Sequence, residues 1–136
     1  MKSAKAKIIY FIIASFAMLA SCGRSTRQSL SPELQHLDSL VAAQPDSALR
    51  YLPQVPVPDV ADRYAYATWC LLKTWTEYRC YQPITTDTLV NKGFGYFVMN
   101  SDDHGRRALA YYLRAVVHEE MKVGDNADHV LDLMKG

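Results

Sequence analysis

Apolar residues recur at steps of three and four along most of the chain after residue 30, and this spacing constrains the fold more than any other feature. The pattern begins with Leu34, Leu37, Leu40 and Val41 and continues as far as Met134. A period near 3.6 residues places such side chains on one face of an α-helix. No stretch shows the strict two-residue alternation of a half-buried strand. The sequence therefore predicts an all-α fold.

Prolines and capping residues divide this pattern into helices. Ser31 is a good capping residue and Pro32 suits a first helical position, and three prolines in residues 53–58 predict an extended connector. Asp59 is expected to cap the third helix, and Gly124-Asp125 is expected to form a turn. The expected helices cover about 31–43, 45–52, 59–80, 85–98, 101–123 and 127–134. Short connections between them predict antiparallel helical hairpins.

The third expected helix has the widest apolar stripe. Its inward positions are Tyr64, Thr68, Leu71, Trp75 and Tyr78, widened by Ala65, Trp69 and Leu72. We expect this helix to be buried on two sides. Gly93 and Gly95 weaken the next helix by about 1 kcal/mol each relative to alanine, so we expect a close helix crossing there.

The N-terminus has the organisation of an export signal. Lys2, Lys5 and Lys7 precede a 13-residue apolar run over residues 8–20. Thirteen helical residues span about 20 Å, whereas a hydrocarbon core is about 30 Å thick. The run is therefore expected to be a cleaved signal peptide rather than a transmembrane helix.

Leu19-Ala20-Ser21-Cys22 follows the apolar run and resembles the lipobox of bacterial lipoproteins. The resemblance implies cleavage before Cys22 and lipidation of its thiol, with two or three acyl chains that hold the protein on a membrane. Residue 23 is Gly rather than the Asp that retains some lipoproteins in the inner membrane, which by resemblance favours the periplasmic face of the outer membrane. The predicted organisation is a signal peptide (1–21), a lipidated tether (22–30) and a helical domain (31–136).

Residues 108–134 resemble a tetratricopeptide repeat. Ala108 to Leu113 is similar to the start of its first helix, Gly124-Asp125 to its turn, and Ala127 to Met134 to its second helix. This resemblance implies a degenerate, right-handed array of helical hairpins. The expected Leu-Gly pair falls on Val116-Val117, which departs from the repeat.

A wider likeness covers residues 31–125 and is to the N-terminal part of lipobox-bearing, repeat-containing bacterial proteins. It rests on five segments in this order: Leu37-Asp38-Ser39-Leu40, Gln44-Pro45-Asp46-Ser47-Ala48-Leu49, Asp62-Arg63-Tyr64-Ala65, Thr86-Asp87-Thr88-Leu89 and Arg106-Arg107-Ala108-Leu109-Ala110-Tyr111-Tyr112. The likeness implies an alternative function, as the truncated sensory N-terminal part of a longer signalling or regulatory protein.

Charge and motifs exclude several functions. Residues 1–21 hold three of the 15 basic residues and none of the 14 acidic ones, so the remainder has a net charge of −2. Such a chain has no basic field for nucleic acid. It has no glycine-rich phosphate loop and no catalytic constellation, so we expect neither an enzyme nor a cofactor. Cys70 and Cys80 lie about 15 Å apart if on one helix, too far for a disulfide, and are expected to be free thiols.

Two further hypotheses remain open at this stage. Asp125, Asp128 and His129 together with Glu119 would approach one another across a hairpin turn as metal ligands, although surface acids are commoner and we expect no metal. The four lie within residues 119–129.

The nine tyrosines and two tryptophans suit either helix packing or a groove that holds a peptide. Tyr66 and Tyr111 lie off the main stripes and are the expected contacts for a partner. The predicted function is a membrane-anchored periplasmic lipoprotein that serves as an adaptor for a protein partner.

Overall fold

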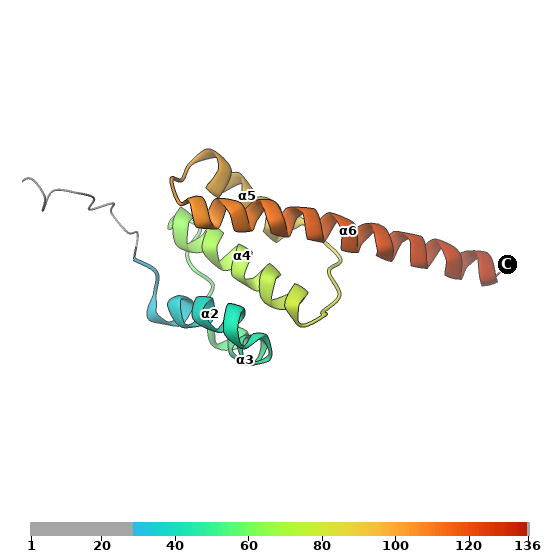
Figure 1. The fold of residues 1–136 in the computed structure, drawn as a ribbon, viewed down its shortest axis with the longest axis horizontal. Helices are drawn as coiled ribbons and strands as arrows, with labels where there is room; N and C mark the ends of the chain where they lie inside the picture. The colour runs from blue at the N-terminus through green and yellow to red at the C-terminus, as the bar shows by residue number, and fades with distance from the viewer. Residues whose placement is uncertain (1–28, 136) are drawn as a thin grey trace, which may run out of the picture.

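The computed structural model describes residues 29–135, with side chains as far as Lys122, and within them every regular element is a helix. The predicted all-α class is confirmed. The elements are α2 (Pro32–Ala43), α3 (Pro45–Tyr51), the short 3-10 turn η1 (Leu52–Gln54), α4 (Arg63–Arg79), α5 (Thr88–Met99) and α6 (His104–Lys135). Figure 1 shows α4, α5 and α6 running alternately in opposite directions, as expected of antiparallel neighbours.

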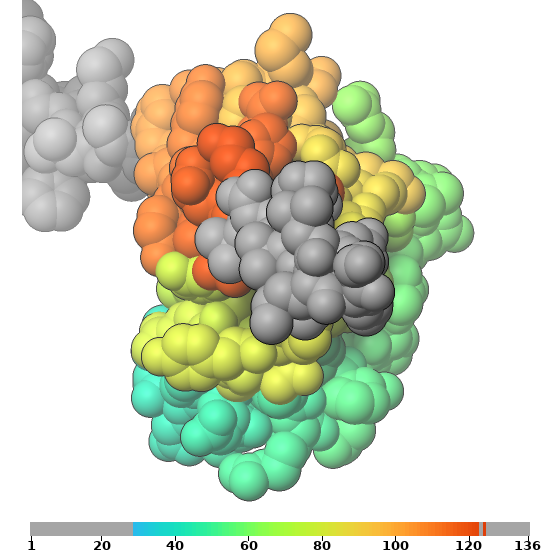
Figure 2. Space-filling model, turned by 90° about the vertical axis from the view of Figure 1, so that its right-hand side faces the viewer, coloured from blue at the N-terminus to red at the C-terminus, as the bar shows by residue number. Residues whose placement is uncertain are grey.

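Helix α4 is the centre of the molecule. It separates the α2–α3 pair from the α5–α6 pair, a layered order that is also visible in the space-filling view of Figure 2. Leu72 belongs to a buried cluster with Leu34 and Leu37 of α2, whereas Leu71 belongs to a second cluster with Phe97 and Leu113. The prediction that the third helix is buried on two sides is confirmed.

The helix starts follow from their capping residues, with one correction. Ser31 accepts the Leu34 N–H at 3.2 Å, as expected. The cap of α4, however, is Asp62, whose carboxylate accepts the Ala65 N–H at 3.2 Å. The expectation for Asp59 was wrong because its carboxylate accepts the Ala61 N–H at 2.8 Å and closes a turn before the helix.

The two glycines of α5 differ. Gly93 is buried, and a Cβ added to it would lie 2.5 Å from Leu71 Cδ2 and 3.2 Å from the Ala67 carbonyl oxygen of α4. This confirms the close helix crossing at Gly93. A Cβ on Gly95 would meet no atom within 4 Å, so packing does not require a glycine there.

Helix α6 corrects the expectation of a final hairpin. It is a single helix of 32 residues from His104 to Lys135, about 48 Å long, and it extends past the rest of the bundle in Figure 1. The predicted turn at Gly124-Asp125 and the separate helix after it are wrong. One glycine costs a helix interior only about 1 kcal/mol, and no proline follows to end the helix. The repeat-like hairpin of residues 108–134 is therefore not formed.

A polar network joins the start of α6 to α2 and α4. Asp103 accepts the Arg106 N–H at 2.9 Å and caps α6, and its second carboxylate oxygen accepts the Tyr64 hydroxyl at 3.0 Å. The Arg106 guanidinium in turn binds both carboxylate oxygens of Asp38 in α2. The α2–α3 pair is thus attached to the rest by apolar contact with α4, by this bidentate ion pair and by hydrogen bonds from Arg79 of α4 to carbonyl oxygens of α2.

Candidate functional site

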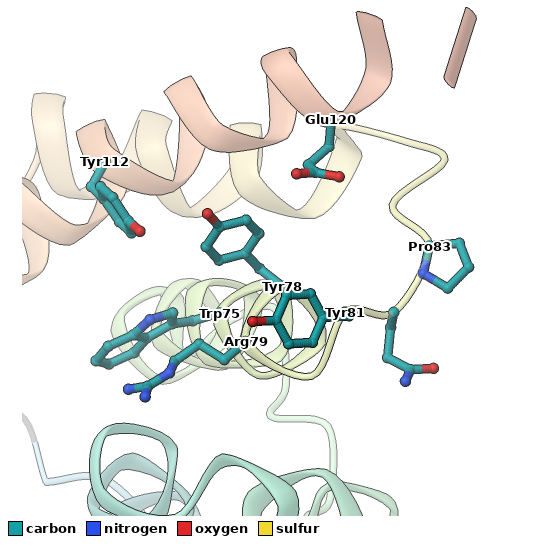
Figure 3. Close-up of a pocket in the computed structure, with 8 residues that line it drawn as sticks. Trp75, Tyr78, Arg79, Tyr81, Pro83, Tyr112 and Glu120 are labelled. Atoms are coloured by element: carbon teal, nitrogen blue, oxygen red, sulfur yellow. The ribbon is translucent and has the colours of Figure 1, made fainter. Parts of the chain in front are cut away.

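The candidate site is an aromatic groove of about 670 Å³ between the end of α4, the segment after it, and α6. Figure 3 shows four aromatic side chains gathered around it, from three different parts of the chain. The residues that line it are Trp75, Tyr78, Arg79, Tyr81, Gln82, Pro83, Tyr112 and Glu120. We call it the aromatic groove.

Tyr81 is held in the groove by an unusual helix end. The Gln82 N–H donates to the Glu77 carbonyl at 2.9 Å and the Tyr81 N–H to the Tyr78 carbonyl at 3.1 Å, the bonding pattern of a Schellman motif. This motif requires one residue in the left-handed conformation, and that residue is usually glycine. Here it is Tyr81, whose φ is 53°. Its side chain is 95% exposed, so no packing within the described chain compensates for the strained backbone.

Tyr78 and Tyr112 form the opposite wall of the aromatic groove. Their ring centroids are 6.4 Å apart with an angle of 77° between the rings, an edge-to-face pair that joins α4 to α6. The hydrogen bond with Tyr112, together with the charge of that phenol, raises the pKa of Tyr78. In Figure 3 the Tyr78 ring points toward α6, between Tyr112 and Glu120.

The two charged residues of the aromatic groove differ in their availability. Arg79 donates to the carbonyl oxygens of Val41 at 3.3 Å and Ala42 at 3.0 Å, where it satisfies the end of α2. Glu120 is exposed and forms no ion pair with any side chain that the structure describes. The groove therefore presents aromatic surface with hydroxyls and one free carboxylate, which suits a peptide segment better than bond-making chemistry.

The structure does not bring the two expected contact residues together. Tyr111 is 54% exposed and packs its ring edge-to-face on Phe94 of α5, with centroids 5.0 Å apart. Tyr66 is half-buried between α4 and α5, stacked near Trp69 at 6.2 Å. Neither lines the aromatic groove. Whether they touch a partner stays a prediction.

The sequence placed Tyr81 and Tyr112 among the aromatic residues that suit either packing or a groove, but singled out neither as a partner contact. The spacing of Leu109, Tyr112, Leu113, Val116 and Val117 predicts that they share the inward face of their helix. Tyr112 is instead 53% exposed, because α6 is an outer helix that covers only one side of the bundle. Tyr81 follows the end of α4, where no apolar period assigns it a side. Its proximity to Pro83 signals the end of a helix but not a left-handed residue.

The remaining expected sites have separate outcomes. Cys22 and the lipobox residues Leu19, Ala20 and Ser21 lie outside the described residues. Cys70 and Cys80 are free thiols, as expected, and burial raises the pKa of both.

Metal binding and membrane crossing find no support in the part of the chain that the structure describes. No three His, Cys, Asp or Glu side chains gather there into a metal-binding group. The open metal hypothesis needs a hairpin turn at Gly124, and α6 is continuous at that residue. None of the helices within residues 29–135 has both the length and the apolar character to cross a bilayer.

Comparison of the chain with protein-family models, with curated proteins and with solved structures returns no match.

Proposed function

We propose that this protein is a lipoprotein of the bacterial cell envelope whose helical domain binds a protein partner through the aromatic groove. In this proposal Cys22 carries the lipid, residues 22–30 form the tether, and the domain lies on the periplasmic face of the outer membrane. The membrane contact is the lipid, and the adaptor acts without cofactor and without nucleic acid.

The observation that carries the binding proposal is Tyr81. A tyrosine in a left-handed position costs about 1 kcal/mol or more relative to glycine, and this one is almost fully exposed. Such strain at an exposed aromatic side chain is typical of binding sites. Three further aromatic residues face the same groove, and aromatic residues are enriched where proteins bind one another.

The lipid anchor is tested by the intact mass of the protein extracted from native membranes. The expected mass is that of a chain beginning at Cys22 plus its acyl groups, and Cys22→Ala abolishes both the lipid and the membrane fraction. An unmodified mass that includes residues 1–21 contradicts the anchor. That outcome leaves the binding proposal intact, because the groove lies in the helical domain.

The binding site is tested by chemical crosslinking in intact cells, followed by purification of the protein in detergent. We expect one crosslinked partner band that is lost in Tyr81→Ala and in Tyr112→Ala. Tyr111→Ala is the matched control for Tyr112→Ala, because Tyr111 is the adjacent residue in sequence and is equally exposed, at 54% against 53% for Tyr112. Retention of the band in both groove variants contradicts the aromatic groove, and its loss in Tyr111→Ala alone favours the contact predicted from sequence.

A further inference from the structure

A second groove of about 550 Å³ lies on the other side of α4, between α4 and α5. Tyr66 faces it, and Tyr66 is nine residues from Trp75 of the aromatic groove, which places the two on opposite sides of the helix. The lining residues are Val60, Arg63, Tyr66, Ala67, Asn91, Lys92, Gly95, Tyr96, Met99 and Asn100. We call it the cationic groove, and it shares no residue with the aromatic groove.

Two cations lie in the cationic groove without acidic partners. The Lys92 ammonium is 3.2 Å from the Tyr66 hydroxyl and 5.5 Å from the centroid of that ring. The Arg63 guanidinium carbon is 5.5 Å from the centroid of the Tyr96 ring. Aromatic rings position both cations, whereas neither forms an ion pair with a described carboxylate, and no lining residue is acidic.

One lining residue of the cationic groove is a glycine that packing does not require. Gly95 lies in a helix interior, where glycine is destabilising, yet a Cβ there would meet nothing within 4 Å. Gly93, two residues earlier, is needed for contact with α4. Gly95 instead leaves space beside two exposed apolar side chains, Met99 at 79% and Val60 at 67% exposure.

We infer that the cationic groove binds an acidic amphipathic segment of a partner protein. Carboxylates of the segment pair with Arg63 and Lys92, and one apolar side chain enters the space above Gly95 and contacts Met99. The charge complementarity selects an acidic segment over a basic one. This inference does not rest on the aromatic groove, because the two sites share no residue.

The test uses a fluorescein-labelled helical peptide of about 15 residues, with leucine on one face and glutamate on its flank, against the same peptide with lysine for glutamate. Binding is measured by anisotropy on the purified protein in non-ionic detergent. We expect the glutamate peptide alone to bind, with affinity that falls as salt is added.

Three variants locate the binding. The double variant Arg63→Glu, Lys92→Glu is expected to weaken it by about tenfold or more. Gly95→Leu fills the groove and is expected to weaken binding as much as the double variant does, without lowering the melting temperature. It therefore keeps the test valid if the double variant does not fold. Tyr81→Ala is expected to leave binding unchanged.

Equal affinity for the lysine peptide overturns the inference, as does the absence of binding by the glutamate peptide. Unchanged affinity in Gly95→Leu also overturns it. Loss of affinity in Tyr81→Ala would show that the acidic peptide binds in the aromatic groove, which overturns the cationic groove as its site. The proposed function would not fail with it, because that function rests on the aromatic groove.

Discussion

The left-handed conformation of Tyr81 predicts that its replacement by glycine stabilises the protein. Its φ of 53° places Cβ close to the following carbonyl, at a cost of about 1–2 kcal/mol that glycine avoids. Glycine is more flexible in the unfolded chain, which offsets about 0.5–1 kcal/mol of that gain. Loss of the ring itself costs little, because the side chain is 95% exposed. We expect Tyr81→Gly to be about 0.5–1 kcal/mol more stable than Tyr81→Ala, which removes the ring but keeps Cβ.

Urea denaturation followed by circular dichroism measures this difference, and thermal melting gives a second reading of about 3–6 °C. Both variants lack the ring, so both should lose the crosslinked partner, although they differ in stability. Equal stability of the two variants would refute the argument from backbone strain. A glycine variant less stable than the alanine variant would refute it more strongly, because it would show that the position tolerates Cβ.

Four further substitutions test other parts of the fold. Gly93→Ala should cost about 1–3 kcal/mol in urea denaturation because its Cβ overlaps a leucine of α4, whereas Gly95→Ala should add up to about 1 kcal/mol. Asp38→Ala leaves the largely buried Arg106 guanidinium unpaired and should cost about 2 kcal/mol by the same measurement. Burial and a hydrogen bond to the carboxylate that caps α6 raise the pKa of Tyr64. The phenol of the unfolded chain therefore ionises first, and the free energy of unfolding falls as pH rises through about 10. In Tyr64→Phe this fall between about pH 9 and 11 should be smaller.

The helices and the central place of α4 were predictable from sequence because apolar spacing reports burial directly. Ser31 also caps as expected, since it precedes the start of a strong apolar period. The choice between Asp59 and Asp62 was not predictable by the same means. Both are aspartates, which cap well, and the path of the proline-rich connector decides which carboxylate meets free N–H groups.

The aromatic groove was less predictable than the fold because it depends on how far α6 runs and which part of it meets α4. Gly124 is compatible with a turn or with a helix, and a difference of about 1 kcal/mol is too small for residue type to decide. Tyr81 adopts a conformation that its residue type disfavours, so only the hydrogen bonds at the end of α4 reveal it. A residue that adopts a backbone conformation its type disfavours indicates a site that sequence patterns do not predict.

The position of α4 between two separate apolar clusters has a consequence for how the protein opens. The α2–α3 pair can detach without exposing the cluster of α5 and α6, because among the described residues the two clusters share α4 and, of their side chains, Trp75. The domain should therefore unfold locally in two cooperative units of unequal size, with α4 shared by both. In native-state hydrogen exchange, amides of α2 would exchange through a partial opening that breaks the Asp38–Arg106 pair and the Arg79 hydrogen bonds to α2. Amides of α4 would exchange only through global unfolding.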